Sequence, residues 1–450
     1  MAKYKAYPEY KDSGVEWLGE IPSHWHFYTG KRLFSSVRTP ALSNDEQLAA
    51  SQKYGVIPQT LMMQLNDSKV MLALKGTDSF RHVQKNNFVI SLRSFEGGIE
   101  YSNYQGCVSP AYTVLKNVKK ISFSFYSYLL KSALYISALQ SSTDSLRDGK
   151  SINYDQFGAI ILPYPFLQEQ SRIAHFLDHE ITKIDKLIEK QQQLIELLKE
   201  KCQAVISHAV TKGLNPDMPM RDSGIEWLGK VPQHWQCTKI KYIAILTPRK
   251  SSIRFKYNDK CTFIPMEKLK RNSLFTDENT LINKVINSYT YFEDNDLLLA
   301  KVTPCFENKN IAIADGLTNG IGFGSTEIYV LRTTKKIRAD YLLYRLQEDN
   351  FMRAATSAMT GAGGLKRVPS EFLLNYPIAL PPQSEIDKIV ESLSKQESHY
   401  NLLELNAMQG IQLLKERRTA LISAAVTGKI DVRNWRVPNE QTAGEAEAVV

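Results

Sequence analysis

Residues 12–25 read DSGVEWLGEIPSHW, and residues 222–235 read DSGIEWLGKVPQHW. Ten of the fourteen positions are identical at a separation of 210 residues, and the exchange of Val for Ile keeps size and polarity. A second pair recurs at a separation of 216 residues: LKEKCQAVISHAVTKGLN at 198–215 and LKERRTALISAAVTGKID at 414–431. Two long matches in the same order predict a tandem repeat that covers most of the chain.

The matched ends enclose two globular segments of similar length, about 26–163 and 236–381. Short β-rich runs alternate in them with Gly- and Asn-rich turns, and helical stretches follow, which predicts an α+β (mixed α/β) fold for each. FYSYLLKS at 125–132 aligns with DYLLYRLQ at 340–347. Each segment ends in prolines, LPYP or LPPQ, and proline disfavours helix in the residue before it.

A long stretch without proline follows each segment, over 168–211 and 383–427. Apolar residues recur in both at spacings of three and four, which is typical of a coiled coil. Each helix would be about 65 Å long, and we expect the two to pair antiparallel, with Gly213 and Gly428 at their ends. The predicted seam comprises Ile173, Leu177, Ile184, Leu194, Leu198, Ile386, Leu393, Ile411, Leu414 and Leu421.

These boundaries predict a pseudo-twofold arrangement of two globular domains and two helices. The segments are an N-terminal segment 1–25, domain 26–167, helix 168–211, linking segment 212–235, domain 236–382, helix 383–427 and C-terminal segment 428–450. The sequence after the second helix resembles the sequence after the first helix. It ends at the point where, in the first repeat, the DSGxEW motif would follow. We therefore expect the two termini to meet. The acidic tail from Asn439 to Val450 is predicted to be flexible.

The composition favours a reduced, cytoplasmic protein with a basic surface. The formal net charge is +9 and the pI about 9.0, which permits phosphate binding without demonstrating it. The five cysteines form no CxxC pair, so we expect free thiols. The N-terminus has no apolar secretion signal, and no stretch reaches the ~18 apolar residues of a membrane helix.

The repeated DSGxEWLGxxPxHW motif, the LPxP or LPPQ exits and the repeated LKE…AVT helix ends together resemble the specificity subunit of type I restriction-modification systems. The resemblance covers about residues 10–436, and NDLLLAKVTPCFEN, GFGSTEIYVLR and TGAGGLKRVPSEF add to it. It implies two target-recognition domains that each read one half of a split, asymmetric DNA site. The helices would act as a ruler and dock two methyltransferase subunits, and restriction subunits would join them.

The resemblance further implies a chain without catalytic residues or cofactors of its own. The assembled complex would be an adenine-specific DNA methyltransferase and an ATP-dependent endonuclease. S-adenosylmethionine, ATP and Mg would be bound by the partner subunits. An alternative hypothesis is a protein-interaction scaffold with a coiled-coil core that does not bind DNA.

Aligning the halves suggests DNA contacts at matched basic positions. Arg93 falls opposite Lys301 and Arg147 opposite Lys366, with Lys150 and Arg367 nearby. Arg and Lys supply both phosphate and base contacts, although a solvated surface charge is the alternative at each position. Three glycines, Gly361, Gly363 and Gly364, indicate either a mobile loop that orders on DNA or a simple turn.

The tryptophans Trp17, Trp25, Trp227 and Trp235 lie in the repeated motif. We interpret them as structural anchors that pin this motif against the helices, with base stacking as the alternative. His175 and His179 have the spacing of a zinc pair, but Phe176 replaces the glutamate of HExxH and no third ligand is evident. We therefore predict no metal site. We also find no complete nucleotide-binding, methyltransferase or nuclease motif, and therefore predict that the chain is not itself an enzyme.

Overall fold

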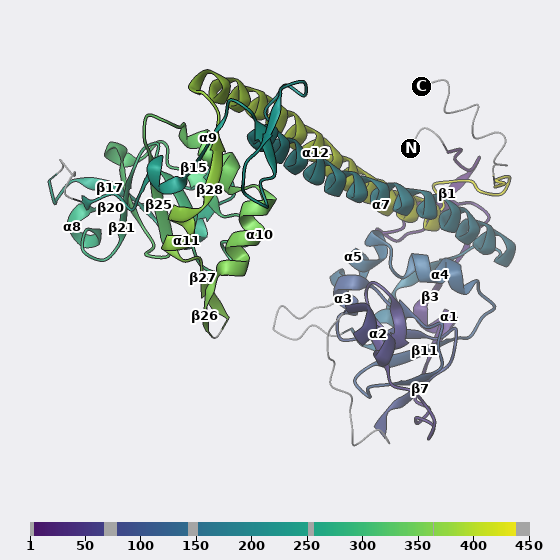
Figure 1. Ribbon diagram of the computed structural model, residues 1–450. Helices are drawn as coiled ribbons and strands as arrows, with labels where there is room; N and C mark the ends of the chain where they lie inside the picture. Colours follow the sequence, from purple (N-terminus) through teal and green to yellow (C-terminus); the bar gives the residue numbers. More distant parts are fainter. Residues whose placement is uncertain (1–3, 67–78, 143–151, 251–255, 363, 438–450) are drawn as a thin grey trace. The chain divides into compact units, whose positions relative to one another are not determined.

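The computed structural model describes residues 4–66, 79–142, 152–250, 256–362 and 364–437 (Figure 1). The chain divides into two compact units. Unit 1 comprises Met1–Gln192 and Gln409–Val450, and unit 2 comprises Gln193–Met408. Each unit therefore contains one globular segment and a part of each long helix. The acidic tail lies outside the described residues.

Helices α7 (Leu167–Lys212) and α12 (Gln383–Val426) contain 46 and 44 residues. Their bounds agree with the predicted 168–211 and 383–427 to within one residue. Both begin just after the proline-marked exits. A glycine with positive φ follows the end of each helix, Gly213 at 82° and Gly428 at 76°. The left-handed backbone conformation that commonly ends a helix has little energetic cost for glycine.

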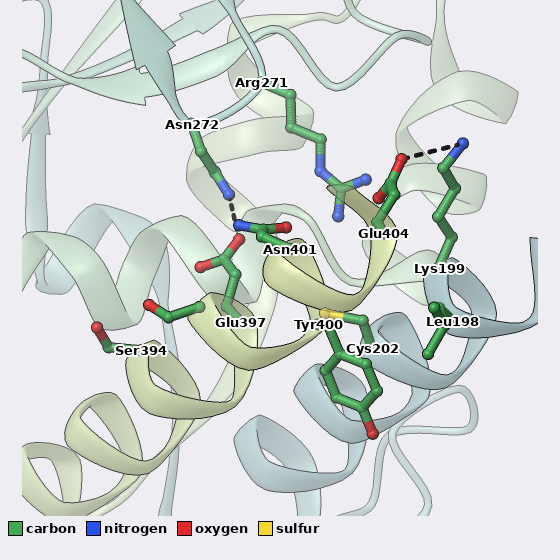
Figure 2. Close-up of a pocket in the computed structure, with 11 residues that line it drawn as sticks. Leu198, Lys199, Cys202, Arg271, Asn272, Ser394, Glu397, Tyr400, Asn401 and Glu404 are labelled. Carbon is green, nitrogen blue, oxygen red and sulfur yellow. Dashed lines mark hydrogen bonds and ion pairs between the residues drawn. The ribbon is translucent and has the colours of Figure 1, made fainter. Parts of the chain in front are cut away.

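The two helices pack side by side and run antiparallel within each unit. In unit 1, Asp185 of α7 forms an ion pair of 3.3 Å with Arg418 of α12, and Leu177 shares an apolar core with Ala425. In unit 2, Lys199 of α7 lies 3.6 Å from Glu404 of α12 (Figure 2). Contacting residues have increasing numbers along α7 and decreasing numbers along α12, as expected of antiparallel helices.

The predicted seam is wrong at Leu194, whose side chain is 43% exposed, whereas the neighbouring Ile195 is buried. After Ile184 the buried stripe steps by four to the partly buried Ile188 and then to Ile195. A three-residue step to Leu187 would have led to the exposed side. The fully buried seam residues are Ile173, Leu177, Ile184, Ile386, Leu393 and Leu421, and the partly buried ones are Leu198, Ile411 and Leu414.

The globular segments contain four-stranded antiparallel sheets with the same strand order. In unit 1 the order is β4 (Phe34–Val37), β11 (Thr113–Asn117), β8 (Phe88–Ile90), β9 (Glu100–Tyr101). In unit 2 it is β16 (Ala244–Leu246), β25 (Ile328–Thr333), β22 (Leu297–Ala300), β23 (Ile311–Ile313). All four residues of β22 are buried, as expected of an apolar run in a central strand.

Unit 2 has a second four-stranded sheet in the order β20 (Asn279–Leu281), β17 (Lys260–Ile264), β24 (Ile321–Gly324), β21 (Thr290–Glu293). Strands β17 and β24 are parallel, and the other pairs are antiparallel. The corresponding part of unit 1 has two small pairs instead: β5 (Leu48–Ser51) with β6 (Gly55–Pro58), and β7 (Arg81–Val83) with β10 (Gly106–Val108).

Two consecutive helices connect each sheet to the long helices. They are α4 (Phe123–Leu129) and α5 (Ala133–Ser141) in unit 1, and α9 (Ala339–Leu346) and α10 (Asp349–Ala358) in unit 2. Their N-caps, Ser122 and Ser132 against Arg338 and Glu348, match at a separation of 216 residues. The alignment of 125–132 with 340–347 was therefore shifted by one residue.

An apolar core fastens each globular segment to the long helices. In unit 1, Phe125 and Leu129 belong to one buried cluster with Phe176 and Leu177 of α7. In unit 2, Tyr341 and Leu342 share a cluster with Val210 of α7 and Ile389 of α12. Apolar burial of this extent is the main favourable contribution to the stability of such a joint.

The repeated motif forms a matching hairpin in both halves. Strands β1 (Tyr10–Asp12) and β2 (Glu20–Pro22) pair in unit 1, and β13 (Met220–Asp222) and β14 (Lys230–Pro232) pair in the same register in unit 2. The first hairpin also receives the end of the chain, because Tyr10 Oη donates to Gly428 O at 3.1 Å and Asp431 N donates to Lys5 O at 2.8 Å. The N-terminal motif thus meets the segment after the second helix, in line with the prediction that the termini meet, while the last residues at both ends lie outside the described part of the chain.

The remaining elements are short. Unit 1 contains β3 (His26–Thr29), α1 (Gly30–Leu33), α2 (Gln59–Asn66), α3 (Ser94–Gly97), α6 (Tyr154–Ala159) and β12 (Ile161–Tyr164). Unit 2 contains β15 (Gln236–Lys239), β18 (Leu269–Lys270), β19 (Ser273–Leu274), α8 (Ile282–Val285), β26 (Thr360–Ala362), β27 (Leu365–Arg367), α11 (Ser370–Asn375) and β28 (Pro377–Leu380). Among the described residues, no helix has the length and apolarity needed to cross a membrane.

Candidate nucleic-acid interface

A β-hairpin projects from the body of unit 2 (Figure 1). Its strands β26 and β27 are exposed along their whole length, and Gly361 pairs with Lys366 between them. Gly361 has φ of 147°, and a Cβ atom there would lie 2.2 Å from Leu365 O. The described part of the glycine-rich segment is thus a regular hairpin, and Gly361 allows its two strands to approach.

Thr303 anchors this hairpin to the end of strand β22. Thr303 N donates to Lys366 O at 3.0 Å, Lys366 N donates to Thr303 Oγ1 at 3.0 Å, and Thr303 Oγ1 donates to Gly364 O at 2.8 Å. Val368 N donates to Lys301 O at 2.9 Å. These bonds bring together three of the basic residues that the sequence singled out, Lys301, Lys366 and Arg367.

The three cations differ in how they are held. The Nε and Nη2 atoms of Arg367 donate to the two carboxylate oxygens of Glu327, both at 2.8 Å. These bonds, with smaller help from Lys301 and against the effect of burial, hold the pKa of Glu327 below its usual value. The Lys301 ammonium lies over the Tyr329 ring, 5.1 Å from its centroid.

Lys366 has no side-chain partner among the residues that the structure describes, and it is exposed. The cluster of Lys301, Lys366, Arg367 and Glu327 therefore carries an excess of positive charge on an exposed two-stranded ribbon. Its chemistry suits an anionic ligand such as a phosphate, or the acceptor groups on a base edge.

Arg93 lies in unit 1 as the residue before α3, with an exposed side chain. The sheet registers do not match it with Lys301. Ile90 pairs with Thr113 of β11 in one sheet, and Leu299 pairs with the equivalent Tyr329 of β25 in the other. Counting onward from Ile90 and Leu299, Lys301 corresponds to Leu92, so the alignment of Arg93 with Lys301 was wrong by one residue, a shift that reverses the face of a strand.

Three predicted residues, Arg147, Lys150 and Gly363, lie outside the described part of the chain. The alignment of Arg147 with Lys366 therefore stays a prediction. Gly364 lies in the hairpin turn with φ of 82°, a conformation that favours glycine.

Sequence reasoning missed a second basic spot, formed by Arg38 and Arg81 in unit 1. Arg81 donates through Nη1 to Tyr112 O at 2.5 Å, and burial, followed by the nearby Arg38 charge, lowers its pKa. Two like charges held near each other attract an anion. The local sequence of either arginine contains no motif that could have identified it, because β7 brings them together only in the folded chain.

The four tryptophans of the repeated motif pack within their units, where Trp25 and Trp235 are buried and Trp17 and Trp227 are partly exposed. Trp25 and Trp235 are 0% and 1% exposed, and Trp25 Nε1 donates to Glu169 of α7 at 3.0 Å. Trp17 contacts Tyr135 edge-on with centroids 5.9 Å apart, and Trp227 stacks on Tyr376 at 4.7 Å. The fully buried indoles of Trp25 and Trp235 have no face free for a base.

The repeated motif also supplies a histidine–glutamate pair to each unit, which sequence reasoning did not connect. His24 Nε2 lies 2.9 Å from Glu169 at the start of α7, and His234 Nε2 lies 2.6 Å from Glu385 at the start of α12. His24 and His234 lie in the repeated motif, but only the fold shows that they contact the glutamates at the starts of the two helices. Within the described residues, no group of three or more His, Cys, Asp or Glu side chains could hold a metal ion.

Comparison with known proteins identifies related sequences. Residues 22–197 match the family profile of the type I restriction modification DNA specificity domain. The EcoEI specificity subunit, a type I restriction enzyme subunit of Escherichia coli, is 32% identical over 213 residues, which cover 46% of this chain and 35% of that protein. The EcoAI specificity subunit of Escherichia coli is 36% identical over 213 residues, which cover 46% and 36%. The chain thus spans about a third of the length of these two relatives.

A more distant relative matches over nearly the whole chain. The putative type I restriction enzyme MjaX specificity subunit of Methanocaldococcus jannaschii is 22% identical over 442 residues, covering 92% of this chain and 96% of that protein.

Two solved structures share the fold. One is a chain from the structure that describes complex assembly and conformational transition of the type I R-M system, with a TM-score of 0.67 and 14% identity, covering 91% of this chain and 99% of that one. The other is the HsdS subunit from Thermoanaerobacter tengcongensis, with a TM-score of 0.53 and 14% identity, covering 91% and 98%. At this identity the likeness concerns the fold alone.

Proposed function

We propose that this chain, which belongs to the family of type I restriction-modification specificity subunits, reads DNA sequence for a complex whose chemistry is carried out by other subunits. The observation that carries the proposal is the basic β26–β27 ribbon of unit 2, on which Lys366 is exposed and has no side-chain partner among the described residues. The major groove of B-DNA admits a two-stranded β-ribbon, and lysine is a recognised reader of guanine there.

The proposed DNA contacts are of two kinds: contacts to phosphates that position the domain, and contacts to base edges that read the sequence. Lys301, held over Tyr329, suits a phosphate contact that orients the domain, whereas Lys366 extends on the ribbon toward a base edge or a second phosphate. Arg367 can join once a phosphate replaces Glu327, since an exposed ion pair contributes little to stability. In unit 1 we assign the same role to Arg93, Arg38 and Arg81, and, from the sequence, to Arg147 and Lys150.

The two domains would read the two halves of one bipartite, asymmetric site. The antiparallel packing of α7 and α12 within each unit supports a continuous two-helix coiled coil that separates the half-sites by a fixed distance. Two linked readers bind the second half-site intramolecularly, so that modest half-site affinities combine. They lie on one face of the duplex only at spacings related to its ~34 Å turn.

The partners would be two methyltransferase subunits and, where the system has them, restriction subunits. Exposed leucines on the long helices support partner docking, because large apolar side chains rarely stay in water in such number on one element. On α7 they are Leu187, Leu194 and Leu197, and on α12 they are Leu402, Leu405 and Leu413. S-adenosylmethionine, ATP and Mg would be bound by those partners, in the cytoplasm.

The decisive experiment is to map methylated adenines across the genome in cells with and without this gene. We expect one bipartite motif to lose methylation when the gene is removed, which would give both half-sites at once. An unchanged methylation map would contradict the proposal in a host that carries the methyltransferase partner.

Binding to duplex DNA at low and raised salt separates a DNA reader from a protein-interaction scaffold. Only the reader loses affinity log-linearly with salt, because phosphate contacts release counterions. The measurement should use the chain together with its methyltransferase partner, and a salt-independent affinity would favour the scaffold.

A further inference from the structure

Unit 2 contains a buried ion pair at the joint between its globular segment and α7. Arg345, at the end of α9, and Glu348, the N-cap of α10, have side chains that are both 0% exposed, and Arg345 Nη1 lies 2.9 Å from Glu348 Oε2. The same Nη1 atom donates to Val210 O of α7 at 3.2 Å. One guanidinium thus connects two helices of the globular segment with the end of a long helix.

Unit 1 has the same joint without the charges. The separation of 216 residues between matched N-caps places Leu129 at the position of Arg345 and Ser132 at the position of Glu348. Leu129 is a buried apolar residue, and the Ser132 side chain caps α5 by accepting from Tyr135 N. The repeated fold therefore forms with neutral residues at these two positions, and the ion pair is an addition specific to unit 2.

Further polar bonds surround the ion pair and reach α7. Gln203 of α7 donates through Nε2 to Gln347 O at 3.1 Å, and its Oε1 accepts from Lys309 Nζ at 3.0 Å. Lys309 also donates to Gln347 O at 2.9 Å.

A second set of polar bonds reaches α12 through Glu397. Asn272 Nδ2 donates to Glu397 Oε1 at 2.6 Å (Figure 2). Tyr344 Oη donates to Glu397 Oε2 at 3.1 Å. Asn272 reaches Glu397 from the turn between β18 and β19, across a polar cavity of about 400 Å³. The globular segment of unit 2 is therefore joined by directional bonds to both long helices.

Stability alone does not account for this arrangement. Burial raises the pKa of Glu348 although Arg345 opposes the shift, which reflects the cost of removing the carboxylate from water. Replacing a buried ion pair by apolar residues is often neutral or stabilising. The hydrogen bond from Arg345 Nη1 to Val210 O, in contrast to an apolar contact, favours one orientation, because a hydrogen bond weakens steeply when the donor angle changes.

We infer that Arg345 and Glu348 are positioning residues that fix the orientation of the second recognition domain on α7 and so narrow the range of spacer lengths accepted between the half-sites. The inference rests on the proposed function. One base pair more or less moves a half-site by about 3.4 Å and turns it by about 34°. A domain with a neutral, less directional joint can follow such a change more readily than one held by charged bonds.

The double variant Arg345→Leu with Glu348→Ser tests the inference, because it copies the residues of unit 1. The substrate is a DNA library in which both half-sites are kept and the spacer varies by one or two base pairs. It is methylated by the full chain with its methyltransferase partner. We expect the double variant to recognise the same half-site sequences as the wild type. The readout is the ratio of methylation at sites whose spacer is changed by one base pair to methylation at sites with the native spacer. We expect this ratio to be at least about threefold higher for the double variant than for the wild type.

Two further variants control for structure. Gln203→Ala removes the partly exposed side chain that bonds Gln347 O and Lys309 Nζ. We expect it to raise methylation at altered spacers as well, but by less than the double variant does. Gln192→Ala changes an exposed glutamine on the same helix and should leave the spacer profile as in the wild type. If the double variant does not fold, Gln203→Ala still decides the question, since a wild-type profile there refutes the inference.

An active double variant with the wild-type spacer profile would refute the positioning role and leave the proposed function intact. A wild-type complex that methylates no specific sequence would instead refute the proposed function, and the inference with it. Uniform loss of methylation at every spacer, in a variant that unfolds at the wild-type temperature, also contradicts the inference, because a change of orientation should redistribute activity among spacers.

Discussion

The neighbouring residues Lys366 and Arg367 on strand β27 differ in whether their charge is paired with a carboxylate. Arg367 is tied to Glu327 by two bonds of 2.8 Å, whereas Lys366 extends from an exposed strand without a side-chain partner among the described residues. A free ammonium can bind an incoming phosphate or guanine without first breaking a bond in the protein. We therefore expect the proposed DNA interface of unit 2 to depend more on Lys366 than on any other described residue.

Lys366→Ala should weaken DNA binding by the assembled complex and reduce the slope of log affinity against log salt by about one. The measurement is a salt titration of binding to duplex DNA. Lys395→Ala serves as the control, because Lys395 is an exposed lysine on α12 that is paired with Glu391. Equal slopes for Lys366→Ala and the wild type would exclude a phosphate contact by Lys366. A loss confined to one DNA sequence would indicate a base contact.

At the scale of single elements, the β26–β27 hairpin depends on the backbone of Gly361. A Cβ atom at Gly361 would collide with Leu365 O, whereas one at Gly364 would meet no atom within 4 Å. Gly361 and Gly364 thus differ in whether they tolerate a side chain. The strands β26 and β27 contribute no buried side chain to a core, so we expect loss of the hairpin to affect the proposed interface more than the stability of the unit.

Gly361→Ala should distort the hairpin, with local strain of about 1–3 kcal/mol, and lower DNA affinity roughly tenfold. The thermal unfolding temperature should fall by only a few degrees. Gly364→Asn is the matched control, because asparagine tolerates positive φ and the position is open. Wild-type DNA affinity for Gly361→Ala would show that the hairpin lies outside the interface.

The long helix α7 offers a test of the seam. Leu177→Ala should lower the free energy of unfolding by about 2–5 kcal/mol, since Leu177 is 0% exposed and truncation leaves a cavity. Leu194→Ala, the same exchange at a side chain that is 43% exposed, should change it by less than about 0.5 kcal/mol. Denaturant titrations measure both. Similar losses for the two variants would contradict the seam through Ile195.

At the scale of the whole molecule, the proposed function makes the helix pair a ruler. The length of the pair would determine the spacer, and the globular segments would determine the words. The two properties can then be changed separately, because they reside in different parts of the chain.

Deleting one heptad from each helix, residues 188–194 and 409–415, should shorten the pair by about 10 Å, or roughly three base-pair steps. The heptad register is kept because seven residues are removed. Methylation mapping should then show the same half-site words at a shorter spacing. Changed words would contradict the division between ruler and readers, and an unchanged spacer would contradict the ruler.

The amino-acid sequence alone determined the tandem repeat, the two long helices to within one residue at each end, and the meeting of the N-terminal motif with the segment after the second helix. These features are local or repetitive. The spacing of apolar residues follows from 3.6 residues per helical turn, and prolines and glycines mark the helix ends. The repeated sequence adopts the same fold in both halves.

The tertiary structure alone decided which residues meet. The alignment of Arg93 with Lys301 and the choice of Leu194 for the seam were each wrong by one position. Sequence matching tolerates such a shift, whereas a strand or a helix turns a different face outward at the next residue. The association of Lys301 with the β26–β27 hairpin, of Arg38 with Arg81, and of Arg345 with Val210 depends on strand pairing and helix packing between distant parts of the chain. No local pattern encodes such contacts.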